Sequence, residues 1–157
     1  MGSRHPSIAP FEAFKTKDGY IIIAAGNDKL FAKLCDVLKI PEASNDERFN
    51  SNSLRCENMD QLKEIFEKQL NSKTTNEWVK EMEALKIPCG PIFNIKQAVE
   101  NPQVQERNMI VKSYHKIIGE FKSAGNPIKM STYKDENTRG NIPDLDEHRE
   151  KIIKEFS

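Results

Sequence analysis

Few residues in this sequence have types and spacings that could support catalysis. Cys89 lies in the segment Ile87 to Pro91, which is predicted to be a rigid loop, and a loop thiol near a positive helix end can act as a nucleophile. No histidine lies near it in the sequence to act as its base, so a structural thiol is the favoured interpretation. His115 and His148 are interpreted as a structural and a solvated side chain. The sequence therefore offers no catalytic residue of its own.

Two groups near the N-terminus could contact an anion. Arg4 and His5 are adjacent and could bind a phosphate, although an exposed histidine without a role is more common. The segment Gly26-Asn27-Asp28 leads from a predicted strand into a predicted helix, whose first N–H groups could also hold an anion. An ordinary helix N-cap at Asn27 is the favoured alternative.

The cysteines do not form a recognisable framework. Cys35, Cys56 and Cys89 are odd in number and widely spaced. A disulfide framework or a zinc site needs paired cysteines or Cys/His clusters at close spacing, which this sequence does not provide. We therefore expect free, buried thiols in a reducing cytoplasm and no bound metal.

Charge and hydropathy argue against two classes of partner. The 24 Lys and Arg residues balance the 24 Asp and Glu residues and are interspersed with them, so no basic field would attract nucleic acid. No apolar run approaches the ~20 residues that a membrane-spanning helix requires. We expect neither nucleic acid nor a membrane as a partner. The length of 157 residues is typical of one domain.

The N-terminal half predicts an arm, a hairpin and several helices. Pro6 and Pro10 keep the arm extended because proline excludes the helical conformation from the residue before it. Strands are predicted at 11–16 and 20–25, and between them Asp18-Gly19 is a strong turn signal because glycine accepts positive φ. Asn27 caps a predicted helix, and 42–58 is predicted to be a polar loop anchored by Phe49 and Leu54. Further helices follow Met59 and the Thr74-x-x-Glu77 capping box, and Trp78 in the latter helix is predicted to be a core residue.

The C-terminal half changes from helical to strand periodicity. Strands are predicted at 109–114, 120–122 and 127–131, followed by a polar linker at 134–143. The pattern Asp144-x-x-Glu147 predicts the cap of a final amphipathic helix that carries Leu145, Ile152, Ile153 and Phe156. The predicted class is α+β: a small antiparallel sheet with intervening helices and a C-terminal helix.

Several segments, in this order and spacing, resemble one protein family. They are RHPSIAPFEAFKTKDGYIIIAAGNDKLFAKLCDVL, DERFNSNSLR, IPCGPIFNIKQAVENPQVQERNMIV, GNPIKMS and PDLDEHREKIIKE. Together they resemble the class III CoA-transferases, also called the CaiB/BaiF family. The sequence of the hairpin is most similar to that of branches of the family that use succinyl-CoA with a dicarboxylic acid. The similarity covers almost the whole chain, but only the small domain and C-terminal tail of the family.

The resemblance implies an enzyme of two domains, of which this sequence contains only the smaller one. In the family, an aspartate of a large Rossmann-like domain attacks an acyl-CoA and passes CoA to an acid through an aspartyl thioester, and two chains form a dimer. That aspartate has no counterpart here. The implied boundaries are an arm at 1–10, the small domain at 11–132, and at 133–157 a linker and helix that return to the large domain.

The functional hypothesis is therefore a fragment of a class III CoA-transferase that is inactive alone, which leaves its standing as an enzyme open. Arg4, His5 and Ser7 are the predicted contacts to acyl-CoA or the residues that close the active site, because they lie in the arm that connects the domains. No tightly bound cofactor is expected, and coenzyme A or acyl-CoA is the substrate of the complete enzyme. The expected partners are the large domain and, in the complete enzyme, a second copy of the chain.

Three alternatives remain open from the sequence. The chain could be a non-catalytic interaction module, for which exposed apolar residues such as Ile8, Phe11 and Phe156 would be the motivation. It could be part of a related acyl-CoA racemase, because racemases share the family framework. It could also be an independent small acyl-CoA binder, although no convergent basic pocket is predicted.

Overall fold

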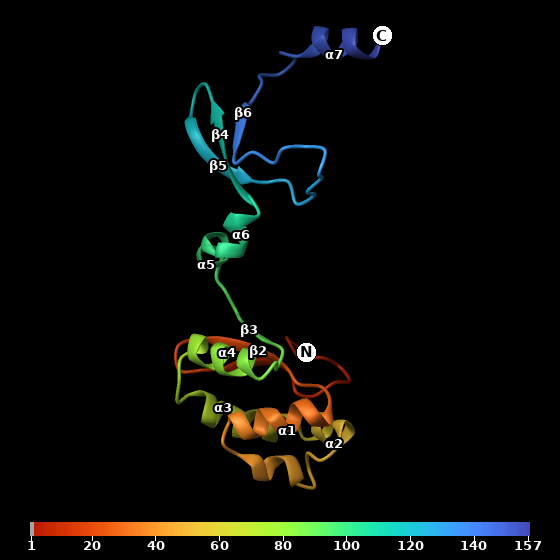
Figure 1. The fold of residues 1–157 in the computed structure, drawn as a ribbon, viewed down its shortest axis with the longest axis vertical. Coiled ribbons are helices and arrows are strands. Elements are labelled where there is room, and N and C mark those ends of the chain that lie inside the picture. The colour runs from red at the N-terminus through yellow and green to blue at the C-terminus, as the bar shows by residue number, and fades with distance from the viewer. Residues whose placement is uncertain (1) are drawn as a thin grey trace. The chain divides into compact units, whose positions relative to one another are not determined.

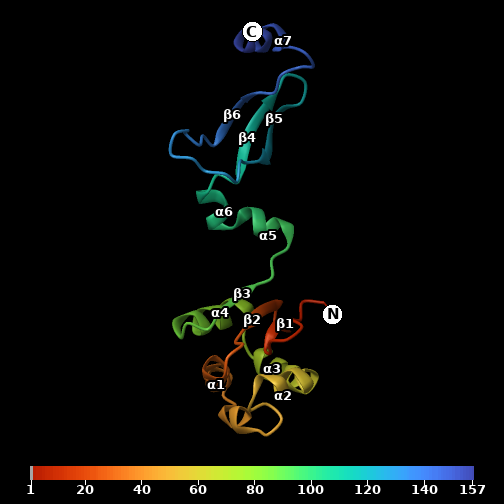
Figure 2. The ribbon, with the colours of Figure 1, turned by 90° about the vertical axis from the view of Figure 1, so that its right-hand side faces the viewer.

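The chain divides into two compact units. The computed structural model describes residues 2–157, with unit 1 ending at Ile92 and unit 2 comprising Phe93–Ser157. Unit 1 contains the elements from β1 to β3, and unit 2 those from α5 to α7, as labelled in Figure 1 and in the turned view of Figure 2. The division within the chain differs from the predicted domain boundaries, which refer to the longer family protein and stay a prediction.

Unit 1 is built on a three-stranded antiparallel sheet in the order β1-β2-β3. Its strands are β1 (Phe11–Lys15), β2 (Tyr20–Ala24) and β3 (Cys89–Pro91). The predicted hairpin is confirmed, with Lys15 paired to Tyr20 at its end. Gly19 does not adopt positive φ there. Glycine at this position instead lets the turn lie close to Thr75, because an added Cβ would lie 3.2 Å from the hydroxyl of Thr75.

Helices connect β2 to β3. They are α1 (Asp28–Val37), the 3-10 helix η1 (Pro41–Asn45), α2 (Asn52–Glu57), α3 (Met59–Leu70) and α4 (Thr75–Ala84). The predicted caps are confirmed: the Asn27 side chain accepts from the N–H of Leu30 at 2.9 Å, and Thr74 forms its capping box with Glu77.

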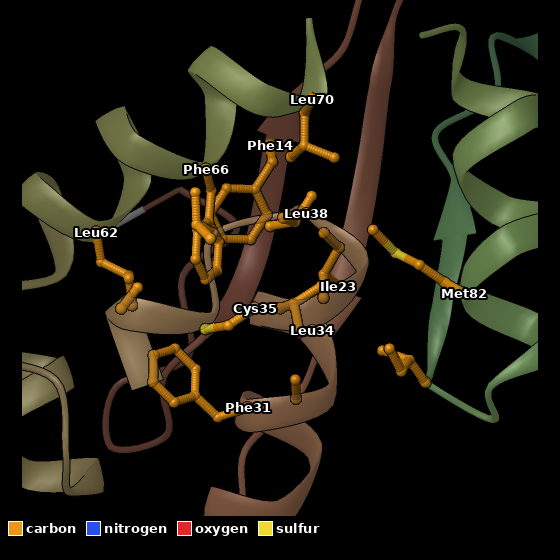
Figure 3. Close-up of a cluster of buried hydrophobic side chains, with 14 of the residues drawn as sticks. Phe14, Ile23, Phe31, Leu34, Cys35, Leu38, Leu62, Phe66, Leu70 and Met82 are labelled. Atoms are coloured by element: carbon orange, nitrogen blue, oxygen red, sulfur yellow. The ribbon is translucent and has the colours of Figure 1, made fainter. Parts of the chain in front are cut away.

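The core of unit 1 lies where α1, α3 and α4 meet the β1–β2 hairpin. Alternation along the strands places Phe14 and Ile21 opposite one another on the buried face. Phe66 of α3 packs on Phe14 with ring centroids 5.7 Å apart, and Figure 3 shows Leu38, the C-cap residue of α1, beside these rings. Trp78 is also buried, which confirms its prediction as a core residue, and its indole N–H donates to the Leu70 carbonyl at 2.7 Å.

Unit 2 contains a second, mixed three-stranded sheet in the order β5-β4-β6. Its elements are α5 (Ile95–Glu100), α6 (Pro102–Glu106), β4 (Ile110–His115), β5 (Gly119–Ala124), β6 (Thr138–Asn141) and α7 (Arg149–Phe156). Strand β4 pairs antiparallel with β5 and parallel with β6, with a register shift between Lys112 and Tyr114. Gly119 has a φ of +76° in the β4–β5 hairpin, where an L side chain would be strained.

Unit 2 buries very little apolar surface. Among residues 93–157, Val111 is the one fully buried hydrophobic side chain. The exposed large apolar side chains of this unit include Ile95, Ile117, Ile118, Ile128, Met130, Tyr133, Leu145, Ile152, Ile153 and Phe156. Helix α7 buries none of its residues, although Ile152, Ile153 and Phe156 share one face at helical spacing.

The α+β class is confirmed, but five local predictions were wrong. The strands form two sheets, one in each unit, in place of the single predicted sheet. The 87–91 segment is not a loop throughout, because Cys89–Pro91 pairs with β2 and Pro91 lies at its end. The 42–58 segment contains η1 and α2, whose N-cap Ser51 accepts from the N–H of Leu54 at 3.4 Å.

The last two errors concern the C-terminal third. The predicted strand at 127–131 does not form, and β6 lies instead within the predicted linker, where Thr138–Asn141 finds a free edge of β4. Helix α7 begins at Arg149, later than predicted. Glu147 does accept from the N–H of Asp144 at 2.7 Å, so half of the predicted capping box forms, but it closes a turn that precedes the helix.

Candidate functional site: the arm pocket

The arm, defined here as Arg4 to Pro10, is held along the outer edge of β1. The N–H of His5 donates to the Phe11 carbonyl at 2.9 Å, and just before the arm the Ser3 hydroxyl accepts from the N–H of Ala13 at 3.0 Å. The arm ends in a cis peptide bond between Ala9 and Pro10. The two hydrogen bonds from His5 and to Ser3 satisfy backbone groups of β1 that an edge strand would otherwise leave unpaired.

Two side chains of α2 fasten the arm to the body of unit 1. Asn52 donates to the Ser7 carbonyl at 2.9 Å and accepts from the N–H of Ala9 at 3.0 Å. Arg55 donates to the Ala9 carbonyl at 2.8 Å and to the Phe49 carbonyl at 2.9 Å. The arm is therefore a fixed wall of unit 1.

Arg55 is fully buried, with a relative exposure of 0%. Its guanidinium also pairs with Asp28 at 2.8 Å and lies 4.5 Å from the ring centroid of Phe31. A buried charge is tolerated only when it is paired and hydrogen-bonded, and here backbone carbonyls, a carboxylate and an aromatic face meet that requirement. Asp28 thus serves Arg55, and the predicted N-cap at Asn27 accounts for the Gly26–Asp28 segment better than an anion site.

Close approach of the arm explains Gly26. A Cβ built on Gly26 would lie 2.3 Å from the Cγ2 of Ile8. Any side chain at this position would displace Ile8 and the arm with it. Ile8 and Phe11 are both half-buried, so the prediction that they are exposed was wrong, whereas Phe156 is exposed as predicted.

Arg4 is engaged with two carboxylates. Its Nε donates to Glu12 at 2.9 Å and its Nη2 to Asp60 at 2.7 Å. The hydrogen bond with Asp60 raises the pKa of Arg4 above its usual value. Glu12 is buried and also accepts from Lys63 at 3.1 Å, so positive and negative groups alternate around the start of the arm. Arg4 therefore links the arm to β1 through Glu12 and to α3 through Asp60.

His5 is positioned by the arm itself. Its ring stacks on Phe11, with centroids 5.3 Å apart and an interplanar angle of 11°. Its Nδ1 accepts from the backbone N–H of Ser7 at 3.2 Å. Ser7 thus contributes through its main chain, and within the described chain no hydrogen bond of its hydroxyl is found.

These residues border a small pocket, called here the arm pocket. It has a volume of about 180 Å³ and is lined by Arg4, His5, Pro6, Ile8, Ala9, Cys56 and Met59. The structure therefore brings together two of the three predicted site residues, Arg4 and His5, at one cavity. Ser7 lies on the arm and does not line it.

Sequence reasoning missed Asn52, Arg55 and Cys56, because 42–58 was interpreted as a polar loop. A signal was available: Ser51 can cap a helix, and one turn of helix would place Asn52, Arg55 and Cys56 along one side. The predicted anchor Phe49 is buried, whereas Leu54 is only half-buried.

Cys89 lacks the features of a nucleophile. Burial, followed by the charge of Glu83, raises the pKa of its thiol, which disfavours the reactive thiolate. Its Sγ lies 4.0 Å from the Val79 carbonyl, which it contacts as a weak donor. Burial likewise raises the pKa of Cys35 to about 12. The structural interpretation of Cys89 agrees with these contacts, and all three thiols are free.

Metal ligation and membrane spanning both need features that residues 2–157 do not show. Within these residues, no group of three or more His, Cys, Asp or Glu side chains is placed to hold a metal ion. None of the described helices combines the length and apolar character needed to cross a bilayer.

Comparison with known proteins gives a consistent assignment. A model of CoA-transferase family III matches residues 1–149. The acetyl-CoA:oxalate CoA-transferase of Acetobacter aceti is 39% identical over 157 residues, which are 100% of this chain and 39% of that protein. The human succinyl-CoA:glutarate CoA-transferase is 34% identical over 98% of this chain and 35% of its own length.

Solved structures agree. A CaiB/BaiF family protein from Brucella suis superposes with a TM-score of 0.78 at 32% identity, over 100% of this chain and 40% of that one. The chain thus spans well under half of the relatives that it matches. On the match to residues 1–149 and on identities above 30% along nearly its whole length, this chain belongs to CoA-transferase family III.

Proposed function

We propose that this chain is the small-domain portion of a class III CoA-transferase, and that it supports CoA transfer from an acyl-CoA to a carboxylic acid only together with the family's large domain. Membership of the family and the 35–39% coverage of its relatives support this proposal. The nucleophilic aspartate that the family resemblance implies would come from the large domain. The complete enzyme is proposed to be a cytoplasmic homo-oligomer.

The observation that carries the proposal is the exposed apolar surface of unit 2. A single hydrophobic side chain of this unit, Val111, is fully buried, while Ile152, Ile153 and Phe156 present an apolar face on α7. Patches of this kind mark surfaces that bind another protein surface. The large domain is the proposed occupant, because more than 60% of each relative's length lies outside the matched segment.

The arm is proposed to close the active site of that assembly. Arg4, His5 and Ser7 lie on it, and Asn52 and Arg55 hold it in one conformation. A wall that is already ordered would not have to be ordered again when substrate binds, which favours binding and orientation of the acyl group. Relatives are named for acetyl-CoA with oxalate and succinyl-CoA with glutarate, so a short dicarboxylic acid is the proposed acceptor.

Reconstitution tests this function. The large-domain portion of the Acetobacter aceti relative would be mixed with the 157-residue chain, and transfer of CoA from acetyl-CoA or succinyl-CoA to oxalate or glutarate would be followed by chromatography of the CoA esters. We expect transfer by the mixture and none by either part. A double variant, Ile152→Asp with Phe156→Asp, should abolish the gain because it places charges on the apolar face of α7. A mixture no more active than the large domain alone would contradict the proposal.

The same mixture distinguishes a CoA-transferase from the alternative, an acyl-CoA racemase. A racemase would exchange the α-hydrogen of a 2-methylacyl-CoA with deuterium from D2O without any acceptor acid, whereas a transferase would not.

The exposed face of α7 also favours a second candidate, a non-catalytic module that binds a protein through Ile152, Ile153 and Phe156. This candidate predicts that the chain alone self-associates as its concentration rises. A strictly monomeric mass by light scattering across a wide concentration range would argue against it.

A further inference from the structure

We infer that the arm pocket binds the oxygen-bearing end of a short aliphatic acid or acyl group, and that the Nε2–H of His5 donates the hydrogen bond that holds it. The inference rests on the proposed function for the substrate class, and on the geometry of the arm for the site and the role of His5. It separates the three arm residues: His5 contacts the ligand, Arg4 braces the arm, and Ser7 orients His5.

The imidazole of His5 has a fixed orientation. The stacking on Phe11, at 5.3 Å and 11°, holds the plane of the ring. The hydrogen bond from the Ser7 N–H to Nδ1, at 3.2 Å, holds the ring within that plane. An exposed histidine without a role has no need of either constraint, and a donor that is already oriented loses less entropy when it binds a ligand.

The same hydrogen bond defines the tautomer. A backbone N–H can only donate, so the Nδ1 of His5 must accept and carries no proton. In the neutral imidazole the proton then lies on Nε2, which becomes a hydrogen-bond donor. Within residues 2–157, no acceptor is found for this Nε2–H. The ring therefore presents one oriented donor whose matching ligand group is an oxygen acceptor.

Charge around the pocket favours an acid or acyl group over a phosphate. Arg4 is the one cationic side chain that lines it, and Arg4 is already paired with Glu12 and Asp60 at 2.9 and 2.7 Å. A phosphate group of coenzyme A would require converging cationic donors that are not engaged elsewhere. A neutral N–H donor suits a carbonyl or carboxylate oxygen.

Size and lining narrow the ligand further. The volume of about 180 Å³ is below the roughly 300–1,000 Å³ typical of pockets for drug-sized ligands, so the adenosine and pantetheine parts of CoA would not fit. Ile8, Cys56 and Met59 offer apolar contacts to methylene groups. A short acid with a methylene chain, such as glutarate, matches both the donor and the lining.

Nuclear magnetic resonance of the 15N-labelled chain tests this directly. Long-range 1H–15N correlations of the imidazole should show His5 as the Nε2–H tautomer. Addition of glutarate should shift the His5 signals along a saturating curve that is about nine-tenths complete at about 10 mM for a site of roughly millimolar Kd. Oxalate, which lacks methylene groups, should bind more weakly, and inorganic phosphate should cause no saturating shift.

The chain contains a matched internal control. The Nδ1 of His115 accepts from the N–H of Ile117, two residues later, at 3.2 Å, the same arrangement as His5 with Ser7. His115 should therefore show the same tautomer, but glutarate should leave its signals unchanged because it does not line the arm pocket. An equal shift of both histidines would mean a general effect of the anion and would overturn the inference.

Two substitutions test the role of Nε2. His5→Gln places an amide N–H near the position of Nε2, whereas His5→Asn places its amide near Nδ1. We expect His5→Gln to keep most of the glutarate affinity, and His5→Asn to lose about five- to tenfold, the loss of one hydrogen bond. The Met59 methyl signal reports pocket occupancy in both variants.

Three further results would overturn the inference: an Nδ1–H tautomer at His5, no saturating shift with glutarate, or equal affinity of His5→Asn and the unchanged chain. None of these measurements requires the large domain. If reconstitution fails while glutarate still titrates His5, the assembly proposal falls and the pocket inference stands. If glutarate does not bind while reconstitution succeeds, the reverse holds.

Discussion

Unit 1 and unit 2 have similar proportions of their residues in helices and strands but bury very different amounts of apolar surface. Unit 1 encloses a continuous cluster that includes Phe14, Phe66 and Trp78, all at most 2% exposed. Unit 2 fully buries Val111 among its hydrophobic side chains, and its other apolar residues are half-buried or exposed. Since burial of apolar surface is the main favourable contribution to folding, unit 1 has the features of an independent domain and unit 2 does not.

The low apolar burial of unit 2 supports the proposal that the large domain covers this unit. Unit 2 is stabilised by its strand pairing and by polar contacts such as those of Asp135. Most of its apolar side chains do not contribute to a buried core. An apolar helix face such as that of α7 stabilises the folded protein only when another surface covers it and removes it from water. Family membership and the short coverage of the relatives support the same proposal through independent observations.

The sharpest test of this comparison is a pair of phenylalanine truncations. Phe66 is 0% exposed and packs on the rings of Phe14 and Phe31, whereas Phe156 is 83% exposed. Phe66→Ala should lower the free energy of unfolding by about 3–5 kcal/mol, because it removes buried area and leaves a cavity. Phe156→Ala should change it by no more than about 0.5 kcal/mol.

Urea unfolding measures both effects. Trp78 is the single tryptophan of the chain and reports unit 1 by fluorescence, while circular dichroism reports the whole chain. If Phe156→Ala destabilised the isolated chain by more than about 1 kcal/mol, unit 2 would have a core of its own and the comparison would fail.

A second test concerns the buried polar centre of unit 1. Arg55→Met keeps an aliphatic side chain but leaves the carbonyls of Ala9 and Phe49 without their donors. We expect a loss of roughly 2–4 kcal/mol, because each buried acceptor left unsatisfied costs about 1–3 kcal/mol. Amide hydrogen exchange should also speed up along the arm, since Arg55 no longer holds it.

Asp28→Asn is the matched control. The Asp28 side chain is 76% exposed, and an asparagine in its place can still accept from Arg55. Its effect should therefore be about 1 kcal/mol or less. A larger loss from Asp28→Asn than from Arg55→Met would show that the ion pair, and not the carbonyl contacts, holds the arm.

Sequence reasoning succeeded where local signals decide the structure. The β1–β2 hairpin and the helix caps at Asn27 and Thr74 depend on residues close together in the chain, and all three are confirmed. Phe49 and Trp78 are also buried as predicted, Phe49 as an apolar anchor of a polar segment and Trp78 from its helical spacing.

It failed where a distant segment decides. Strand β6 has weak strand propensity and forms because β4 offers it a free edge, which no local pattern reveals. Arg55 carries a charge that sequence rules place at the surface, yet its partners Ala9 and Asp28 come from the arm and α1. Of the candidate site, Arg4 and His5 could be named from their place in the arm, but the pocket wall from α2 could not.

The last and smallest effect compares how two low-pKa carboxylates respond to acid. Lys129 first, and then Arg139, lower the pKa of Asp135 in unit 2 from 3.8 to about 2. Hydrogen bonds from Arg48 lower the pKa of Asp46 in unit 1 to the same value. Each contribution to stability is complete above about pH 4, where the unfolded group is ionised, and is lost as the pH falls through about 2 in the folded state.

The structural consequences should differ between the units. Asp135 joins separate segments, because it also accepts from Asn108 through its backbone carbonyl at 2.9 Å and from Arg139 at 2.8 Å. Protonation of Asp135 should loosen the 126–137 loop and shift its amide resonances between pH 4 and pH 2. Asp46 bonds to Arg48 two residues away, so the core of unit 1 should keep its tertiary signals over the same range. Asp135→Asn should remove the pH dependence of the loop, and an unchanged titration in that variant would assign the effect to another carboxylate.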